Sequence, residues 1–180
     1  MTLKILFYSA VLMIAMLGYR SYAMAGELPK VGSFAPNFKL NDAQGKTHQL
    51  ADYAGNYVVL YFYPKDDTPG CTKEACQFRD DLAKLEKLGA KVVGVSVDNS
   101  DSHANFAKKY HLPFPLLSDT DGKVADSYGA LRHLIVVKIA KRYTFLIDPQ
   151  GKIAQVYTKV DTSKHSQQII DDLNNIQKNQ

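Results

Sequence analysis

The pattern of apolar positions along the chain predicts alternating strands and helices. Residues 57–63, Tyr-Val-Val-Leu-Tyr-Phe-Tyr, are seven consecutive apolar β-formers, and residues 91–97 form a second, largely apolar run. Unbroken apolar runs of this length are typical of strands that are buried on both faces of an α/β sheet. The two runs therefore predict neighbouring strands near the middle of a sheet.

Between these runs the spacing of apolar residues changes to three and four. This spacing predicts a helix from residue 71 or 72 to Leu88, and Gly89 is placed to end it. The helix carries apolar side chains at Phe78, Leu82, Leu85 and Leu88.

The remaining elements are shorter and are predicted from the same two periodicities. We expect strands at 47–50, 116–117, 143–148 and 153–157, and helices at 102–110, 122–128 and 163–177. Residues 131–141 stay open between an extended loop and a strand leading into 143–148. The order of elements is that of a thioredoxin-like α/β domain, with a central mixed sheet flanked by helices.

The first 25 residues have the three parts of a secretory signal. Lys4 gives a positive start, residues 5–17 form an apolar run of about 13 residues, and Ala23-Met24-Ala25 places small side chains two apart. We expect residues 1–25 to be a signal peptide cut before Gly26, leaving residues 26–180 as a single domain. The alternative is an uncleaved membrane anchor, although a spanning helix needs about 20 apolar residues.

Charge excludes some classes of partner. The whole chain has a net charge of +4, and removal of Lys4 and Arg20 with the signal would leave 4 − 2 = +2. The basic residues are dispersed along the chain, which argues against nucleic acid and against an anionic membrane surface. A membrane is expected as a partner only if the signal remains uncleaved. The predicted compartment is the bacterial periplasm, with a membrane-anchored form facing it as the alternative.

The two cysteines, Cys71 and Cys76, need an explanation other than a structural disulfide. An exported protein with two cysteines first suggests a bridge. A bridge that closes so short a loop constrains the unfolded chain little, however, because loop entropy grows with loop length. The pair therefore calls for an explanation in reactive chemistry.

The surroundings of Cys71 suit a reactive thiol. A buried strand ends before Pro64, a loop follows, and Thr68-Pro69-Gly70 leads into Cys71 at the first turn of a helix. Helix N-termini present unpaired N–H groups and about half a positive charge, which stabilise a thiolate. Thr68 adds a hydroxyl. A peroxide needs such a thiolate to attack one oxygen and donors to hold the departing one.

Cys76 lies five residues after Cys71. In an ideal helix the two Cα atoms would lie about 8–9 Å apart, whereas a disulfide tolerates at most about 7 Å. The thiols therefore cannot bond while the helix is intact. Our hypothesis is that the first helical turn unwinds when Cys71 is oxidised.

This segment resembles the peroxiredoxins, in particular the subfamily called bacterioferritin comigratory protein or peroxiredoxin Q. The pattern Pro-x-x-x-Thr-x-x-Cys occurs as Pro64, Thr68 and Cys71, and Thr68 to Cys76 match the subfamily's Thr-Pro-Gly-Cys-Thr-x-Glu-Ala-Cys in full. Arg142-Tyr-Thr-Phe-Leu-Ile-Asp stands where the family places its active-site arginine. The resemblance covers about residues 28–178.

The resemblance assigns a role to each of these residues. It implies a thioredoxin-like fold of the peroxiredoxin type, with Cys71 as the peroxidatic cysteine and Cys76 as the resolving cysteine. Thr68 and Arg142 would polarise the peroxide and hold the thiolate, and Pro64 would shield it. Residues 131–141 depart from the family because they are apolar where it often has a longer, more charged stretch, so the rim of the site is left undefined.

The resemblance also implies a complete catalytic cycle. The enzyme would reduce hydrogen peroxide and organic hydroperoxides in antioxidant defence, form an intramolecular Cys71–Cys76 disulfide, and be recycled by a thioredoxin-like dithiol. No metal, haem, flavin or other cofactor is expected. A monomer suffices for such a cycle.

Other interpretations of the same residues remain. Cys71 and Cys76 could be packing thiols, Arg142 a solvated charge beside a strand, and Glu74 an acid favoured in the first helical turn. From other classes, a copper-binding thioredoxin-like protein would have three residues between its cysteines, and a thiol–disulfide oxidoreductase would have two. Four residues lie between the cysteines here. The five histidines show no metal-ligand spacing with the cysteines. A non-catalytic binding module is the third option.

Overall fold

The computed structural model describes residues 26–134 and 137–179. The predicted signal segment, residues 1–25, lies outside this part of the chain. In chain order the elements are β1 (Lys39–Asp42), β2 (Thr47–Gln49), η1 (Leu50–Tyr53), β3 (Tyr57–Phe62), α2 (Pro69–Asp80), α3 (Leu82–Lys87), β4 (Ala90–Ser96), α4 (Ser100–Tyr110), β5 (Leu116–Ser118), α5 (Lys123–Ser127), β6 (Leu131–Leu134), β7 (Val137–Ala140), β8 (Tyr143–Ile147), β9 (Ile153–Tyr157) and α6 (His165–Lys178).

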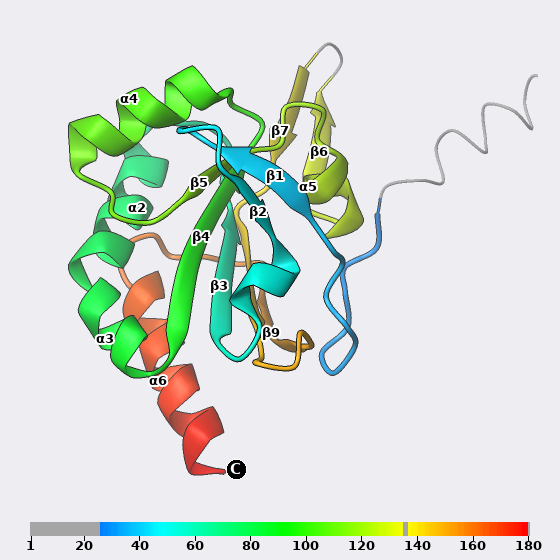
Figure 1. Ribbon diagram of the computed structural model, residues 1–180, viewed down its shortest axis with the longest axis vertical. Helices are drawn as coiled ribbons and strands as arrows, with labels where there is room; N and C mark the ends of the chain where they lie inside the picture. Colours follow the sequence, from blue (N-terminus) through cyan, green and yellow to red (C-terminus); the bar gives the residue numbers. More distant parts are fainter. Residues whose placement is uncertain (1–25, 135–136, 180) are drawn as a thin grey trace, which may run out of the picture.

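A mixed sheet of seven strands forms the centre of the molecule, in the order β2-β1-β5-β4-β3-β8-β9 (Figure 1). Strands β3, β4 and β5 run parallel, whereas β8 pairs antiparallel with β3, and β1 pairs antiparallel with β5. The prediction of a thioredoxin-like α/β fold with a central mixed sheet is thereby confirmed.

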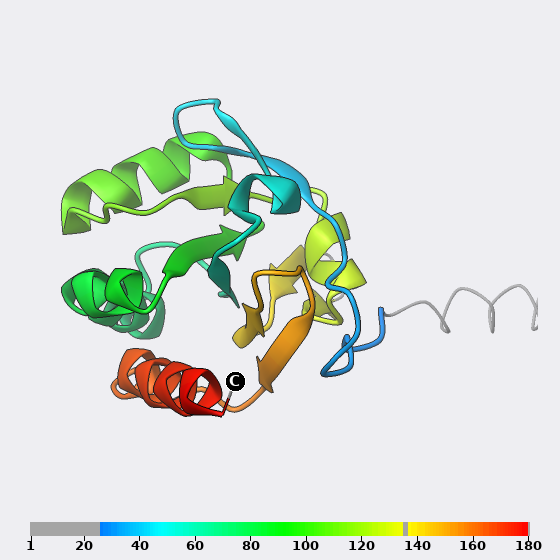
Figure 2. The same ribbon diagram turned by 60° about the horizontal axis from the view of Figure 1, so that its bottom comes forward.

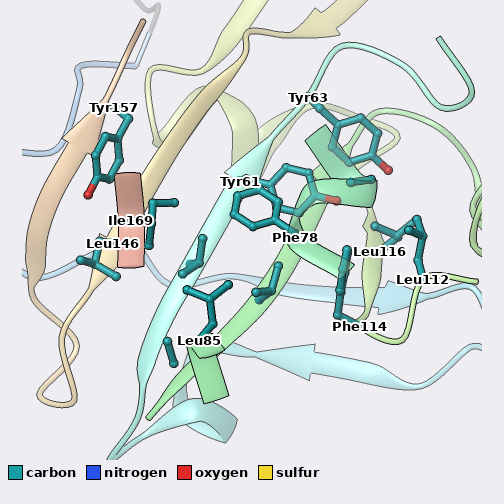
Figure 3. Close-up of a cluster of buried hydrophobic side chains, with 14 of the residues drawn as sticks. Tyr61, Tyr63, Phe78, Leu85, Leu112, Phe114, Leu116, Leu146, Tyr157 and Ile169 are labelled. Carbon is teal, nitrogen blue, oxygen red and sulfur yellow. The ribbon is translucent and has the colours of Figure 1, made fainter. Parts of the chain in front are cut away.

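Strand β3 is buried on both faces, as its apolar run predicts. All six of its residues are buried, and because side chains alternate along a strand they enter two separate cores. Val59, Tyr61 and the following Tyr63 join one hydrophobic cluster, shown in Figure 3. Val58 and Leu60 join the cluster on the opposite face.

Helices cover both faces of the sheet unequally. Figures 1 and 2 show α2, α3, α4 and α6 on one side, and α5 with the hairpin of β6 and β7 on the other. The first cluster receives Phe78 from α2, Phe106 from α4 and Leu173 from α6. The second receives Ala125 from α5 and Leu131 from β6. No helix among the described residues has the length and hydropathy needed to cross a membrane.

The prediction of one helix up to Leu88 is wrong in its detail. The helix starts at Pro69 and is divided at Asp81, where φ is −96° and ψ is 3°. The Asp81 carboxylate accepts hydrogen bonds from Ser166 Oγ of α6, at 2.6 Å, and from Lys84 Nζ, at 2.7 Å. Apolar spacings of three and four are compatible with a locally tighter turn, so they do not reveal a bend at a polar residue.

In the segment that the sequence left open, residues 131–134 and 137–140 form a separate two-stranded antiparallel sheet. Strand β6 pairs with β7, with Leu131 opposite Ala140 and Leu134 opposite Val137. The hairpin thus returns the chain to Lys141, whose N–H bonds the carbonyl of Ala130 at 2.6 Å. From this point the chain enters β8.

Candidate active site

Cys71 lies in the first turn of α2, immediately beyond the carboxyl end of β3. Pro69 occupies the first helical position, where its missing N–H costs nothing, and Thr68 precedes it with extended backbone angles. Cys71 is the third residue of the helix and is 1% exposed. The predicted placement of this thiol at a helix N-terminus is confirmed.

Arg142 reaches the thiol from the neighbouring strand. Tyr143, the first residue of β8, lies opposite Phe62, the last residue of β3, so the residue before β8 stands beside the start of α2. The Nη2 atom of Arg142 donates to Cys71 Sγ at 3.2 Å. A Cβ atom at Gly70 would lie 3.2 Å from this nitrogen, so glycine leaves the guanidinium room to approach.

Glu74 completes this arrangement, and the sequence did not identify it as a site residue. The side chain is 1% exposed, and its Oε2 accepts a hydrogen bond from Arg142 Nη1. Its Oε1 is buried with no hydrogen-bond partner among the described residues. Burial raises the pKa of Glu74 to about 7, although Arg142 opposes the rise. Its position three residues after Cys71, on the same helix face, was the available signal.

Thr68 and Pro64 lie at the edge of the site. The Thr68 hydroxyl donates to the carbonyl of Lys65 at 3.0 Å, so its oxygen keeps lone pairs that can accept a further hydrogen bond. Pro64 is half-buried and lines a cavity of about 410 Å³ together with Arg142. The structure therefore places Pro64, Arg142 and Cys71 together, with Thr68 at the helix start.

The hairpin of β6 and β7 supplies one wall of this cavity. The cavity is lined by Arg132, Ile139, Ala140 and Lys141 from this hairpin, and also by Thr158 and Val160. The wall combines apolar side chains with cationic ones. These four residues of the segment whose role the sequence left open thus form part of the rim beside Arg142.

The loop between β3 and α2 is held by two consecutive aspartates. Asp66 accepts hydrogen bonds from Tyr63 Oη and Ser102 Oγ, both at 2.7 Å, and lies 2.8 Å from Nδ1 of the fully buried His103. Asp67 has a φ of 55° and pairs with Lys109 Nζ at 2.7 Å. Three of these partners, Ser102, His103 and Lys109, lie on α4. Sequence reasoning weighed His103 only as a metal ligand and missed this role.

Cys76 lies further along α2 and is partly exposed, and the two cysteines are not bridged. Both belong to the same continuous helix, so the distance argument against a bond in the intact helix applies. Within the described residues, no group of three or more His, Cys, Asp or Glu side chains is arranged to hold a metal ion.

A thioredoxin-like fold with a buried thiol at a helix start, held by an arginine, defines a thiol-dependent redox protein. The chain belongs to the AhpC/TSA family, which matches residues 31–156. It is 46% identical over 145 residues to a putative peroxiredoxin Bcp of Coxiella burnetii, covering 78% of this chain and 96% of that protein. It is 48% identical over 134 residues to the chloroplastic peroxiredoxin Q of Triticum aestivum, covering 74% of this chain and 61% of the wheat protein.

A solved structure agrees with these relatives. The crystal structure of peroxidoxin BcpB from Mycobacterium tuberculosis superposes with a TM-score of 0.78 at 36% identity, covering 82% of this chain and 98% of that chain. The predicted resemblance to the Bcp and peroxiredoxin Q subfamily is confirmed, and the chain is a peroxidase of the peroxiredoxin type.

Proposed function

We propose that this peroxidase reduces hydrogen peroxide and organic hydroperoxides with Cys71 as the attacking thiolate. The observation that carries the proposal is the contact of 3.2 Å between Arg142 Nη2 and Cys71 Sγ at the start of α2. A permanent cation and a helix N-terminus both stabilise a thiolate.

In the first step the Cys71 thiolate attacks one peroxide oxygen. The S–O bond forms, the O–O bond breaks, and the departing alkoxide takes a proton to leave as alcohol or water, so that Cys71 becomes a sulfenic acid. Arg142 stabilises the negative charge that develops on the departing oxygen. The Thr68 hydroxyl, whose proton is directed to Lys65, accepts the hydrogen bond of the incoming peroxide, and Pro64 shields the thiolate from water.

In the second step Cys76 attacks the sulfenic acid. The S–S bond forms, the S–O bond breaks, and hydroxide leaves as water after taking a proton. Because the intact helix holds the cysteines too far apart, the N-terminal turn of α2 unwinds before this bond forms. A thioredoxin-like dithiol then reduces the disulfide. The cycle is complete within one chain, and we propose a monomer.

We further propose that the protein works in the bacterial periplasm as residues 26–180, after cleavage of residues 1–25. Gly26 supports this cleavage site. Its backbone nitrogen lies 3.2 Å from Asp126 Oδ1, so cleavage would place the new α-ammonium group beside a carboxylate. Retention of the segment as a membrane anchor facing the periplasm is the alternative, and N-terminal sequencing of the protein from its native cells separates the two.

Cysteine variants test the peroxidase proposal directly. We expect Cys71→Ser to abolish peroxide consumption, because no other described cysteine lies at the Arg142 site. Cys76→Ser should still reduce about one equivalent of peroxide and then stop as a sulfenic acid. Peroxide consumption by Cys71→Ser at the rate of the intact protein would refute the proposal, and a thioredoxin-coupled assay of both variants measures it.

A further inference from the structure

A buried pair of an aspartate and a histidine anchors the loop that leads to Cys71. Asp66, in this loop, is 7% exposed, and His103 of α4 is 0% exposed. His103 Nδ1 lies 2.8 Å from Asp66 Oδ2, whereas the Nε2 atom of the same ring is buried with no hydrogen-bond partner among the described residues. Of the two ring nitrogens, the fold therefore pairs Nδ1 and places it on the Asp66 carboxylate.

The Asp66 side chain is an ionised acceptor of three hydrogen bonds. Burial raises the pKa of Asp66, but hydrogen bonds from His103, Ser102 and Tyr63 lower it by more. Tyr63 Oη donates to Oδ1 and Ser102 Oγ donates to Oδ2, both at 2.7 Å. An ionised carboxylate only accepts, so Nδ1 of His103 carries the proton that joins the two side chains.

The peptide unit between Lys65 and Asp66 connects this pair to Thr68. Its N–H belongs to Asp66 and donates to Asp98 Oδ2 at 2.9 Å. Its carbonyl belongs to Lys65 and accepts the hydrogen bond of the Thr68 hydroxyl at 3.0 Å. Because a peptide unit is planar, the position of Asp66 sets the direction of the Lys65 carbonyl, and the carbonyl sets the direction of the Thr68 hydroxyl.

We infer that His103 is a positioning residue of the peroxide step, which acts through Asp66 on the hydroxyl of Thr68. The inference rests on the proposed function, because it requires Thr68 to accept the hydrogen bond of the incoming peroxide. While the Lys65 carbonyl takes the hydroxyl proton, the lone pairs of the oxygen stay free for the substrate. Loss of the His103 anchor lets the carbonyl turn, and the hydroxyl then loses its fixed direction.

The second anchor of the loop cannot replace this pair. Asp67 lies 2.7 Å from Lys109 Nζ, but the two side chains are 46% and 57% exposed. Water screens such an ion pair, so it holds the loop weakly. Removal of a donor from Asp66, by contrast, leaves a buried carboxylate short of a partner and forces the loop to adjust. The direction of the Lys65 carbonyl therefore depends on the buried pair.

The test is a double-mutant cycle between His103 and Thr68. His103→Leu removes the donor to Asp66, and Thr68→Val removes the hydroxyl with little change of shape. Competition kinetics against a reference peroxidase measures the second-order rate constant for Cys71 oxidation in the intact protein, both single variants and the double variant. His103→Asn is the conservative variant, because its amide can donate from close to the position of Nδ1.

His48→Leu is the matched control, because His48 is also a buried histidine that contacts an aspartate. It is 8% exposed, and its Nε2 lies 2.8 Å from Asp42 Oδ2. Its strand, β2, is at the edge of the sheet, with the strands β1, β5 and β4 between it and β3. Thermal unfolding of every variant reports the loss of stability beside the loss of rate. His103→Gln, whose amide lies one bond further out, repeats the cycle if His103→Leu does not fold.

We expect His103→Leu to lower the rate constant by about fivefold to twentyfold, because a misdirected group loses much of its contribution to the step. In the Thr68→Val background the same substitution should lower it by less than about twofold, since residues that act as one unit are not additive. His103→Asn should recover most of the rate, and His48→Leu should stay near the intact protein.

Three results would overturn the inference. The first is a double variant whose loss equals the product of the two single losses, since His103 would then act by a route other than Thr68. The second is an equal loss of rate in His48→Leu, and the third is a His103→Asn protein as slow as His103→Leu. A Thr68→Val protein that is oxidised at the intact rate would refute the role of Thr68 in the proposed function, and the inference with it.

Discussion

At the scale of single residues, the guanidinium of Arg142 donates hydrogen bonds to two acceptors at once. Its Nη2 donates to Cys71 while Nη1 pairs with Glu74. Among the residues that the structure describes, only one oxygen of the Glu74 carboxylate finds a hydrogen-bond partner, and the whole side chain is buried. Glu74 therefore holds Arg142 in place, but burial disfavours its ionised form. The pKa of Glu74 is accordingly raised to about 7.

Glu74 should make the stability of the protein fall as pH rises. The folded state holds the Glu74 proton up to about pH 7, whereas the unfolded chain releases it near pH 4.3. The folded state thus binds more protons in this window, and stability declines with pH through it. Relative to Glu74→Gln, we expect the intact protein to lose about 3 kcal/mol of unfolding free energy between pH 4.5 and 7.5. Urea unfolding at a series of pH values measures this.

The matched control for this prediction is Glu86→Gln, which changes an exposed acid of α3 and should leave the pH dependence unchanged. Parallel pH profiles for Glu74→Gln and the intact protein would show that Glu74 ionises normally.

Arg142→Lys should slow the peroxide step more than its retained charge suggests. Lysine cannot reproduce the planar fork that reaches Cys71 and Glu74 together. Loss of one donor aimed at developing charge lowers a rate by about a hundredfold or more. Competition kinetics against a reference peroxidase measures the rate constant for Cys71 oxidation. Lys91→Arg, an exposed change on β4, serves as the control, and a loss of less than threefold in Arg142→Lys would contradict the assigned role.

At the scale of elements, α2 carries both cysteines and is held unequally along its length. Its far end is tied to α4 by Arg79 and to α6 through the following Asp81. Its first turn rests on the Arg142 contacts with Cys71 and Glu74. In the proposed mechanism, oxidation of Cys71 removes the thiolate that Arg142 would stabilise. We therefore expect the first turn to be the part of the helix that opens.

Hydrogen exchange should detect this opening. We expect backbone amides of residues 72–77 to lose protection in the oxidised protein, while those of α6 stay protected. Unwinding of the turn removes their intrahelical hydrogen bonds, whereas the packing of Ile169 and Leu173 is unaffected. Mass spectrometry of reduced and oxidised samples reports it. Equal protection of residues 72–77 in both forms would rule out the unwinding step.

Elements with strong periodicity could be predicted from the sequence, and contacts between distant elements could not. The run at 57–63 identified β3 and its burial on both faces. The contact of Arg142 with Cys71 depends on the pairing of β3 with β8, which no local pattern encodes, so only the family resemblance indicated it. Glu74 was missed because an acid in a first helical turn is ordinarily solvated. The bend at Asp81 depends on a bond to Ser166 in another helix.

At the scale of the whole molecule, the segment that starts at Gly26 meets α5 on the face of the sheet away from α2 (Figure 1). Gly26 packs so closely that an ideal Cβ atom there would lie 1.6 Å from the Asp126 carbonyl oxygen, so glycine is required. Gly129, with a φ of 63°, approaches the carbonyl of Gly26 in turn. Cleavage before Gly26 would therefore add a positive charge to the existing contact between the Gly26 nitrogen and the Asp126 carboxylate.

A chain that begins at Gly26 should gain stability from its free amino group. We expect Asp126→Asn to destabilise this chain by about 0.5–1 kcal/mol, because it removes a partly exposed ion pair. In a chain that begins at Met24 the same substitution should cost less, since the Gly26 nitrogen is then a neutral amide. Thermal unfolding of both chains, each with and without Asp126→Asn, measures the difference in the cost of the substitution. Equal costs in both backgrounds would show that the ammonium group makes no such pair.

The most direct test of the peroxidase mechanism is the intact mass of the reduced protein before and after one equivalent of peroxide. The mechanism predicts the loss of two hydrogen atoms, as Cys71 and Cys76 join, and no such loss in Cys76→Ser, which should gain one oxygen atom. A gain of one oxygen atom in the intact protein, with no loss of hydrogen, would contradict it and remove Cys76 from the mechanism.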